Sequence, residues 1–162
     1  MKHPFDLISI HIHKSAGTSF RLILQSIYGN AIKRLDISDP EKIITVDEQP
    51  VLLTELPTDL KIAHGHFTYQ NFKYVFGKPD VPMITWIRNP VERVISLYYY
   101  LIEQYNNKVE HTEETEDIFG RLCKSLLEFT TIPKNRNVQT RYLNGSSLED
   151  FSFIGIVEHF DD

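Results

Sequence analysis

Near the N-terminus, two hydrophobic patterns with different periods follow one another. Segment 7–12 is short, β-branched and mostly apolar, as in a strand buried on both faces of a parallel sheet. After Lys14 the residues are small, and from Phe20 apolar residues recur at i, i+3, i+4 and i+7, the spacing of one helix face. The pattern predicts a strand, a tight loop and a helix, with a buried stripe of Phe20, Ile23, Leu24 and Ile27.

A second strand and helix follow in the middle of the chain. Segment 81–87 predicts a core strand that ends at Arg88. Asn89, Pro90 and Glu92 form a helix start, with Asn as N-cap, Pro in the first helical position and Glu as the returning arm of a capping box. This helix would bury Val91, Val94, Ile95, Tyr98, Leu101 and Ile102. Two such units predict an α/β fold with a central parallel sheet flanked by helices.

Weaker patterns fill the rest of the chain. Brief strands are predicted at 43–46, 60–63 and 151–157. A helix at 67–76 would be closed by Gly77, and a short turn from 138 by Gly145. One further helix is predicted from the acidic turn 113–116 through Phe129, whereas 36–57 carries a loose pattern broken by three prolines.

Composition narrows the class of protein. A chain of 162 residues with 41% hydrophobic and 24% charged residues is expected to be one soluble globular domain, 1–162. A net charge of −5 argues against nucleic-acid binding and membrane-surface binding, but leaves room for a local basic pocket. The single cysteine, Cys123, excludes an internal disulfide. With neither a signal peptide nor an apolar membrane span, a cytoplasmic location without stable membrane insertion is expected.

The first strand–loop–helix unit is suited to bind an anion. The first backbone N–H groups of a helix have no internal partner and point into the preceding loop, which favours a phosphate there. Lys14 adds a positive charge, and the Ser and Thr hydroxyls add donors. Arg88 at the end of the second strand and Ser96 two turns into its helix could hold another anion. Together they suggest a ligand with two separate phosphates.

These segments resemble a known family. HIHKSAGTSF and TWIRNPVERVISLYYY are similar to the two nucleotide-binding signatures of the sulfotransferase superfamily, which uses 3′-phosphoadenosine 5′-phosphosulfate (PAPS). More narrowly, they resemble the branch of the heparan and dermatan 2-O-sulfotransferases and their bacterial relatives. The AHGHF, NVQTRYLNG and FIGIVEHFDD segments are also similar to that branch. The resemblance implies a P-loop-like three-layer fold, PAPS as cosubstrate without a metal, and an acceptor hydroxyl, most simply on a glycan.

The resemblance also implies roles for individual residues. The 5′-phosphosulfate would be held by Lys14, Ser15, Gly17, Thr18 and Ser19, and the 3′-phosphate by Arg88 and Ser96. Either His64 or His66 would be the base, with His66 slightly favoured; a neutral imidazole is suited to take a hydroxyl proton. Arg141 and Gln139 are candidates for contact with the acceptor or the cosubstrate.

Two departures from the family pattern stand out. His13 occupies the place of a common proline, and relatives usually continue with further helices beyond the segment that ends at Asp162. A domain without those C-terminal helices is therefore expected, which leaves its acceptor cleft open to question.

Other interpretations remain open from sequence alone. The two histidines could be a metal pair, but no nearby Cys or carboxylate supplies a third ligand. A P-loop kinase or NTPase would need G-x-x-x-x-G-K-[ST], whereas here the Lys precedes the Gly. A non-catalytic nucleotide-binding protein of the same fold is the third possibility. The acceptor and the oligomeric state are not readable from the sequence.

Overall fold

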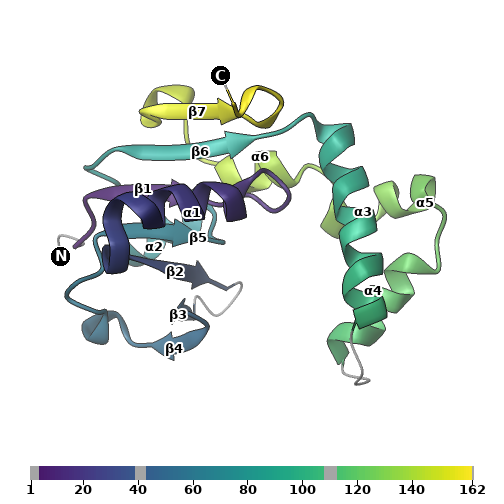
Figure 1. Cartoon of the computed structure of the whole chain (residues 1–162), viewed down its shortest axis with the longest axis horizontal. Coiled ribbons are helices and arrows are strands. Elements are labelled where there is room, and N and C mark those ends of the chain that lie inside the picture. Colours follow the sequence, from purple (N-terminus) through teal and green to yellow (C-terminus); the bar gives the residue numbers. More distant parts are fainter. Residues whose placement is uncertain (1–3, 39–42, 108–112, 162) are drawn as a thin grey trace.

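A seven-stranded sheet forms the centre of the molecule (Figure 1). The computed structural model describes residues 4–38, 43–107 and 113–161. The strands stand in the order β4-β3-β2-β5-β1-β6-β7. Their bounds are β1 Leu7–Ile10, β2 Ile32–Ile37, β3 Ile44–Val46, β4 Gln49–Val51, β5 Ile62–Gly65, β6 Met83–Ile87 and β7 Phe153–Ile156.

Most of the strand pairings are parallel. β1 pairs in parallel with both β5 and β6, β2 pairs in parallel with β5, and β7 with β6. At one edge of the sheet, β3 pairs in antiparallel fashion with both β2 and β4. The predicted α/β fold is confirmed, with the difference that the sheet is mixed at this edge.

Helices cover both faces of the sheet and create three layers. On one face, α1 (Gly17–Tyr28) packs Phe20 and Leu24 against Leu7, Ile32 and Ile62. On the other face, α2 (Tyr69–Phe76) and α6 (Val138–Leu143) cover the larger core, which contains Ile8, Ile10, Leu35, Phe72 and Val138. Successive strand residues point to opposite faces, so each inner strand contributes to both cores.

A group of helices stands beside the sheet, beyond the carboxyl end of β6 (Figure 1). It consists of α3 (Pro90–Asn107), α4 (Glu113–Leu122) and α5 (Leu126–Thr131). Leu101, Ile118 and Phe129 form a separate apolar cluster there. The long helix α3 links the two parts, because its first turn continues directly from β6.

The predicted start of α3 is confirmed at Asn89 and wrong at Glu92. Oδ1 of Asn89 accepts hydrogen bonds from the N–H groups of Val91 (2.9 Å) and Glu92 (3.3 Å). The backbone N–H of Asn89, however, donates to Oε1 of Glu158 at 2.8 Å. A carboxylate from the end of the chain therefore takes the place predicted for Glu92, which lies 3.9 Å from Arg88 instead.

Two predicted apolar stripes are only partly buried. In α1, Ile23 and Ile27 are 44% and 66% exposed, because α1 contacts the sheet through the Phe20–Leu24 face and no described residue covers the other side. In α3, Val91 is 62% exposed, whereas Arg93 is buried. The face of α3 that packs on α4 and α5 carries Leu101 with Val94, Leu97 and Tyr98.

Three further segments differ from the sequence prediction. The single helix predicted from 113 to 129 is two helices, because Ser125 begins α5 with a capping box closed by Glu128. β2 and β4 were not predicted. Burial in β2 does not alternate strictly: Ile32, Leu35 and Ile37 are buried, whereas Lys33 and Arg34 are consecutive, half-buried polar residues in a strand that pairs on both sides.

The larger core should respond strongly to truncation of Phe72. This side chain is 1% exposed and contacts the rings of Phe5, Phe67 and Phe76. Phe72→Ala is expected to lower the free energy of unfolding by about 3–5 kcal/mol in urea titrations. Tyr74→Ala, on the same helix but 77% exposed, is the matched control and should change it by less than about 0.5 kcal/mol. Equal effects would contradict this description of the core.

Candidate functional site

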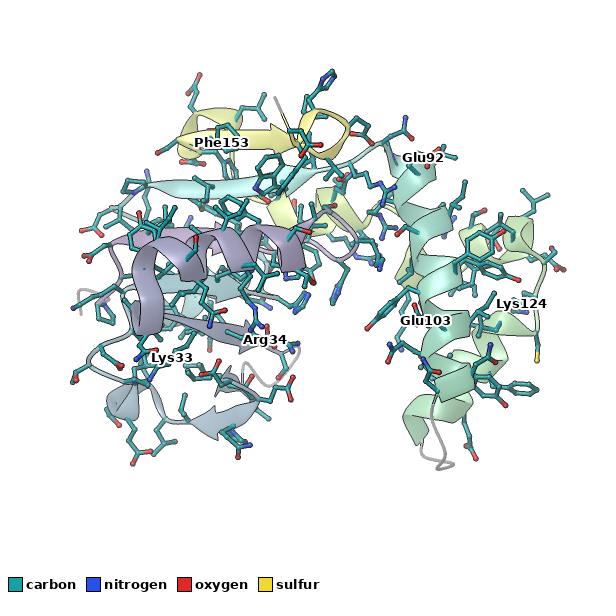
Figure 2. All side chains as sticks on the ribbon, viewed as in Figure 1. Lys33, Arg34, Glu92, Glu103, Lys124 and Phe153 are labelled. Atoms are coloured by element: carbon teal, nitrogen blue, oxygen red, sulfur yellow. The ribbon has the colours of Figure 1, made fainter. Side chains whose placement is uncertain are left out.

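A cavity of about 1050 Å³ lies at the carboxyl ends of β1, β5 and β6. Eight of its lining residues are Lys or Arg and only two, Asp47 and Glu48, are acidic, although the whole chain is negatively charged. Figure 2 places Arg34 on the sheet and Glu103 on α3, across from each other. The cations that line the cavity are Lys14, Arg21, Arg34, Arg88, Arg93, Arg121, Lys134 and Arg141.

The loop between β1 and α1 presents the open end of a helix to this cavity. Phe20 N–H makes the first helical hydrogen bond, to Ala16, and no side chain caps the helix. The N–H groups of Gly17, Thr18 and Ser19 therefore have no partner within the helix. Lys14 and Ala16 have φ values of 65° and 56°, a backbone conformation found in anion-binding nests. The geometry fits an anion such as a phosphate.

Gly17 is required by packing against the neighbouring histidine. A Cβ at this position would lie 1.8 Å from the imidazole of His11. Ser15 is placed differently from the other loop residues: it is 1% exposed, and its hydroxyl is buried without a hydrogen-bond partner. The backbone of Ser15 shapes the loop, while its side chain faces the interior.

Lys14 and Arg88 bring positive charge to the same cavity from different strands. Nζ of Lys14 lies 4.1 Å above the ring of Tyr100. Burial and the nearby Arg88 guanidinium lower the pKa of Lys14, whereas Glu103 opposes this effect. Two cations held close together favour an anion between them. Ser96 also lines the cavity, so the structure brings together both predicted anion-binding groups.

Gln139 holds the backbone at the end of β6. Its Oε1 accepts a hydrogen bond from the N–H of Arg88 at 2.7 Å, and its Nε2 donates to the carbonyl of Arg88 at 2.8 Å. Both ends of the amide are thus engaged by one residue. Gln139 fixes the position of Arg88 rather than presenting free donors to the cavity.

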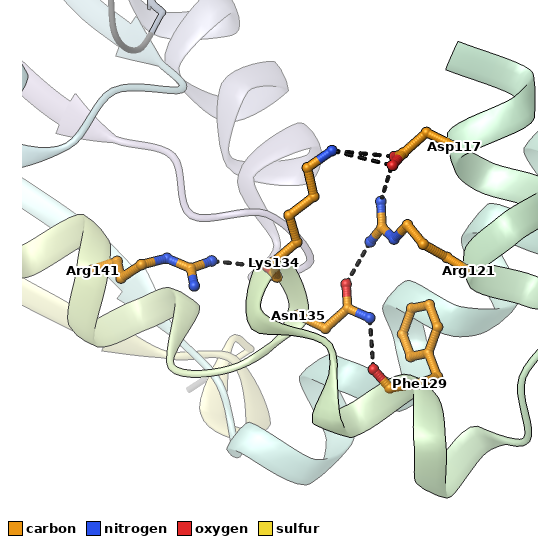
Figure 3. Close-up of polar contacts among 6 residues, drawn as sticks. All are labelled: Asp117, Arg121, Phe129, Lys134, Asn135 and Arg141. Atoms are coloured by element: carbon orange, nitrogen blue, oxygen red, sulfur yellow. Dashed lines mark hydrogen bonds and ion pairs between the residues drawn. The ribbon is translucent and has the colours of Figure 1, made fainter. Parts of the chain in front are cut away.

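Arg141 and its neighbours form one wall of the cavity (Figure 3). The guanidinium of Arg141 donates to the carbonyls of Pro133, Lys134 and Arg136 at 2.7–2.8 Å. In the same wall, Lys134 and Arg121 share the carboxylate of Asp117, at 3.2 and 3.5 Å. Most of the donors of Arg141 thus hold the loop, while its charge remains at the cavity.

Four histidines meet where β1 and β5 end. The ring centroids of His13 and His66 are 3.9 Å apart and nearly parallel, and those of His11 and His66 are 4.2 Å apart. His64 stacks on His11 at 5.3 Å. Among the residues that the structure describes, no three His, Cys, Asp or Glu side chains converge as metal ligands would. Sequence reasoning singled out His64 and His66 but not the contribution of His11 and His13.

The two histidines of the HGH segment have different surroundings. His64 is 1% exposed, and its Nδ1 lies 2.9 Å from the hydroxyl of Ser9. Burial and, to a smaller extent, the nearby His66 lower the pKa of His64 to about 4. The side chain of His66 is 18% exposed and lines the cavity. His66 is therefore the more accessible of the two.

Asp36 and Arg34, on the unpredicted strand β2, surround His66. Oδ1 of Asp36 accepts the backbone N–H of His66 at 2.6 Å and lies 3.3 Å from Nδ1 of the same residue. Nε of Arg34 lies 2.8 Å from the other carboxylate oxygen of Asp36. Sequence reasoning missed both residues. The available signal was their spacing, because positions two apart on a strand share a face.

Comparison with known proteins identifies the family. A family model described as "Sulfotransferase family" matches residues 1–162. The chain belongs to the sulfotransferase family. One similar solved structure is the mouse sulfotransferase SULT7A1 complexed with PAP, at 17% sequence identity and a TM-score of 0.45. The match covers 73% of this chain and 40% of the mouse chain. None of the curated proteins matches the sequence.

The family assignment confirms the resemblance seen in the loop and Arg88 segments of the chain. The kinase or NTPase interpretation, which already lacked its motif, is not supported by this match. In the described part of the chain, no helix is both long and apolar enough to span a bilayer.

The buried histidines predict that the protein loses stability in mild acid. Burial, together with neighbouring histidines, lowers the pKa of His11 to about 2, and that of His64 is lowered to about 4. Both groups would titrate near 6.5 when unfolded, so unfolding takes up protons below that pH. Above pH 6.5 these histidines should not make the free energy of unfolding depend on pH. Below pH 6.5 it should fall by about 1.4 kcal/mol per unit decrease in pH for each histidine.

Urea titrations between pH 7.5 and 5 measure this slope. His64→Asn removes one titrating group, so unfolding should take up about one proton fewer and the slope should fall by about 1.4 kcal/mol per pH unit. This change is expected whatever the effect of the variant on absolute stability. A slope that is unchanged in the variant, or absent in the parent chain, would contradict a neutral buried His64.

Proposed function

We propose that this sulfotransferase transfers a sulfuryl group from PAPS to a hydroxyl of a glycan. The observation that supports the proposal is that two groups suited to bind anions line one cavity. One is the open end of α1 with Lys14, and the other is Arg88 with Ser96. A donor with a 5′-phosphosulfate and a 3′-phosphate has its anionic groups at two separate positions, which this arrangement matches.

Lys14 and the loop backbone would stabilise the departing phosphate. In the transfer, the bond between sulfur and the bridging phosphate oxygen breaks, the bond between sulfur and the acceptor oxygen forms, and adenosine 3′,5′-bisphosphate (PAP) leaves. Negative charge grows on the bridging oxygen as this bond breaks. The Lys14 ammonium would stabilise that charge together with the N–H groups of Gly17, Thr18 and Ser19, which have no partner within the helix. The proposed step assigns no role to a metal.

His66 is proposed as the base that takes the proton of the acceptor hydroxyl. Its side chain lines the cavity, whereas His64 is almost fully buried. A pKa of about 4 also makes His64 a weak base at neutral pH. His64 is proposed instead to support the site, through its contact with Ser9 and its stacking on His11.

The remaining cations of the cavity support a polar or anionic acceptor. Arg34, Arg93 and Lys134 line the cavity from elements other than the α1 loop, namely β2, α3 and the turn Pro133–Asn135. Arg93 is buried, and its guanidinium donates to the carbonyl of Asn135 at 2.7 Å. Arg141 is proposed to act on the acceptor through its charge, and Gln139 through the position of Arg88.

Calorimetry with PAP and ADP, without magnesium, tests the donor assignment. If Arg88 and Ser96 hold a 3′-phosphate, PAP should bind at least about 10-fold more tightly than ADP, or about 1.4 kcal/mol. Arg88→Ala should abolish this preference. Lys33→Ala, which removes a surface cation paired with Asp59, is the control and should preserve it.

Equal affinity for PAP and ADP in the parent chain would show that the Arg88 and Ser96 assignment is wrong. Binding of ADP only with magnesium would instead favour a kinase-like enzyme.

Replacement of His66 tests the base assignment. His66→Ala is expected to lower the rate of radiolabelled sulfate transfer from PAPS to a panel of soluble glycans by about 10²- to 10⁴-fold. Affinity for PAP should be unchanged, because the base contacts the acceptor. Loss of PAP binding together with turnover would contradict the assignment, and binding of PAP without any turnover in the parent chain would indicate a non-catalytic protein.

A further inference from the structure

We infer that Asp36 is a positioning residue for the base: its carboxylate holds Nδ1–H of His66 and leaves Nε2 free to accept the proton of the acceptor hydroxyl. This inference rests on the proposed function of His66. Asp36 belongs to a strand that carries no sequence motif. Its role follows from the contacts between β2 and the end of β5.

The carboxylate of Asp36 is fixed from both sides. Oδ1 accepts the backbone N–H of His66 at 2.6 Å, and Oδ2 lies 2.8 Å from Nε of Arg34. Arg34 is held in turn by Glu48, at 2.7 Å. Because both oxygens have a partner that does not depend on the imidazole, the carboxylate has a set position before the ring of His66 meets it.

Close approach of two strands brings Asp36 to His66. β2 and β5 are parallel with Arg34 opposite His64. Continued beyond that pair, the same register places Leu35 opposite Gly65 and then Asp36 opposite His66. Gly65, which precedes His66, faces the backbone of β2, and a Cβ there would be 1.9 Å from the carbonyl oxygen of Leu35 and 2.8 Å from Oδ1 of Asp36. Only a residue without a side chain allows this approach, which links the glycine of the HGH segment to the carboxylate.

The ring of His66 is also held by its neighbours. His13 stacks on it with an interplanar angle of 14°, and His11 lies against it at 30°. His13 in turn meets the edge of Tyr142, with ring centroids 5.9 Å apart. This packing restricts rotation of the imidazole and keeps the same ring nitrogen toward Asp36.

Two groups compete for Nδ1 of His66. Oδ1 of Asp36 lies 3.3 Å from it and a terminal nitrogen of Arg34 lies 3.4 Å from it. Arg34 also lies 2.8 Å from Asp36 through Nε and donates to Glu48 at 2.7 Å through its other terminal nitrogen, so it keeps two carboxylate partners in either tautomer of His66. An unprotonated Nδ1 would set its lone pair against a carboxylate oxygen, whereas Nδ1–H makes a charge-assisted hydrogen bond. The balance favours the tautomer with the proton on Nδ1.

This arrangement supports the proton step without moving a proton to Asp36. Burial alone raises the pKa of the Asp36 carboxyl, but the hydrogen bonds from His66 and the charge of Arg34 lower it on balance. Asp36 therefore stays ionised at neutral pH. When Nε2 takes the hydroxyl proton, the imidazolium that forms lies beside a fixed negative charge.

Nuclear magnetic resonance of the imidazole nitrogens tests the tautomer directly. Long-range ¹H–¹⁵N correlation spectra of the PAP-bound chain at neutral pH should show His66 with the proton on Nδ1. In Asp36→Asn this preference should be lost. Neither readout depends on turnover, so the result stands even if sulfate transfer is not detected. A parent chain with the proton on Nε2 would overturn the inference.

Kinetics of the same variants test the consequence. Asp36→Asn should lower the rate of sulfate transfer from PAPS to the glycan panel by at least about 10-fold, with PAP affinity unchanged. Asp36→Glu should recover part of the rate. Asp59→Asn, which removes an exposed carboxylate paired with Lys33 of the same strand, should leave the rate unchanged. An unchanged rate in Asp36→Asn would overturn the inference, whereas absence of turnover in the parent chain would count against the proposed function alone.

Discussion

Parallel pairing of β1 with β5 and β6 is the constraint on which the site depends. Parallel strands end at the same edge of a sheet, so whatever follows each strand meets there. Here β1 delivers the α1 loop with Lys14, β5 delivers His66, and β6 delivers Arg88. These residues are far apart in the sequence. The burial of Ile8, Ile10 and Met83 in the inner strands stabilises the sheet and thereby holds the three groups together.

The site concentrates features that are unfavourable for folding. Positive side chains crowd one cavity, and several buried polar atoms have no partner, among them the hydroxyl of Ser15 and one terminal nitrogen of Arg93. His11 and His64 are kept neutral at the cost of acid stability. Crowded like charges and buried polar atoms without a partner are expected where a protein binds a ligand. An anionic donor and acceptor would relieve the repulsion among the cations, which links the electrostatics of the cavity to the proposed reaction.

The parts of the fold and site that were predictable are those encoded locally. The strand, loop and helix around Lys14, and the strand that ends at Arg88 with its Asn89 cap, each depend on residues that are neighbours in the sequence. The resemblance to sulfotransferases rested on these same segments, and the family match agrees with it.

The parts that were not predictable depend on contacts between distant segments. β2 lacks a clear alternation, and its value to the site appears only when it lies beside β5 and brings Asp36 to His66. Glu158 replaces Glu92 at the start of α3 because the end of the chain packs there. The exposed side of α1 could not be foreseen either, since periodicity shows which residues share a face but not how much of that face a neighbour covers.

A crystal structure of the chain with PAP bound is the most direct test of the central claim, that one cavity holds both phosphates of the donor. The account predicts the 5′-phosphate on the N–H groups of Gly17, Thr18 and Ser19, within reach of Lys14. It predicts the 3′-phosphate on Arg88 and Ser96, with His66 facing the position of the transferred group. A nucleotide bound outside this cavity, or in it with the 3′-phosphate away from Arg88, would contradict the account.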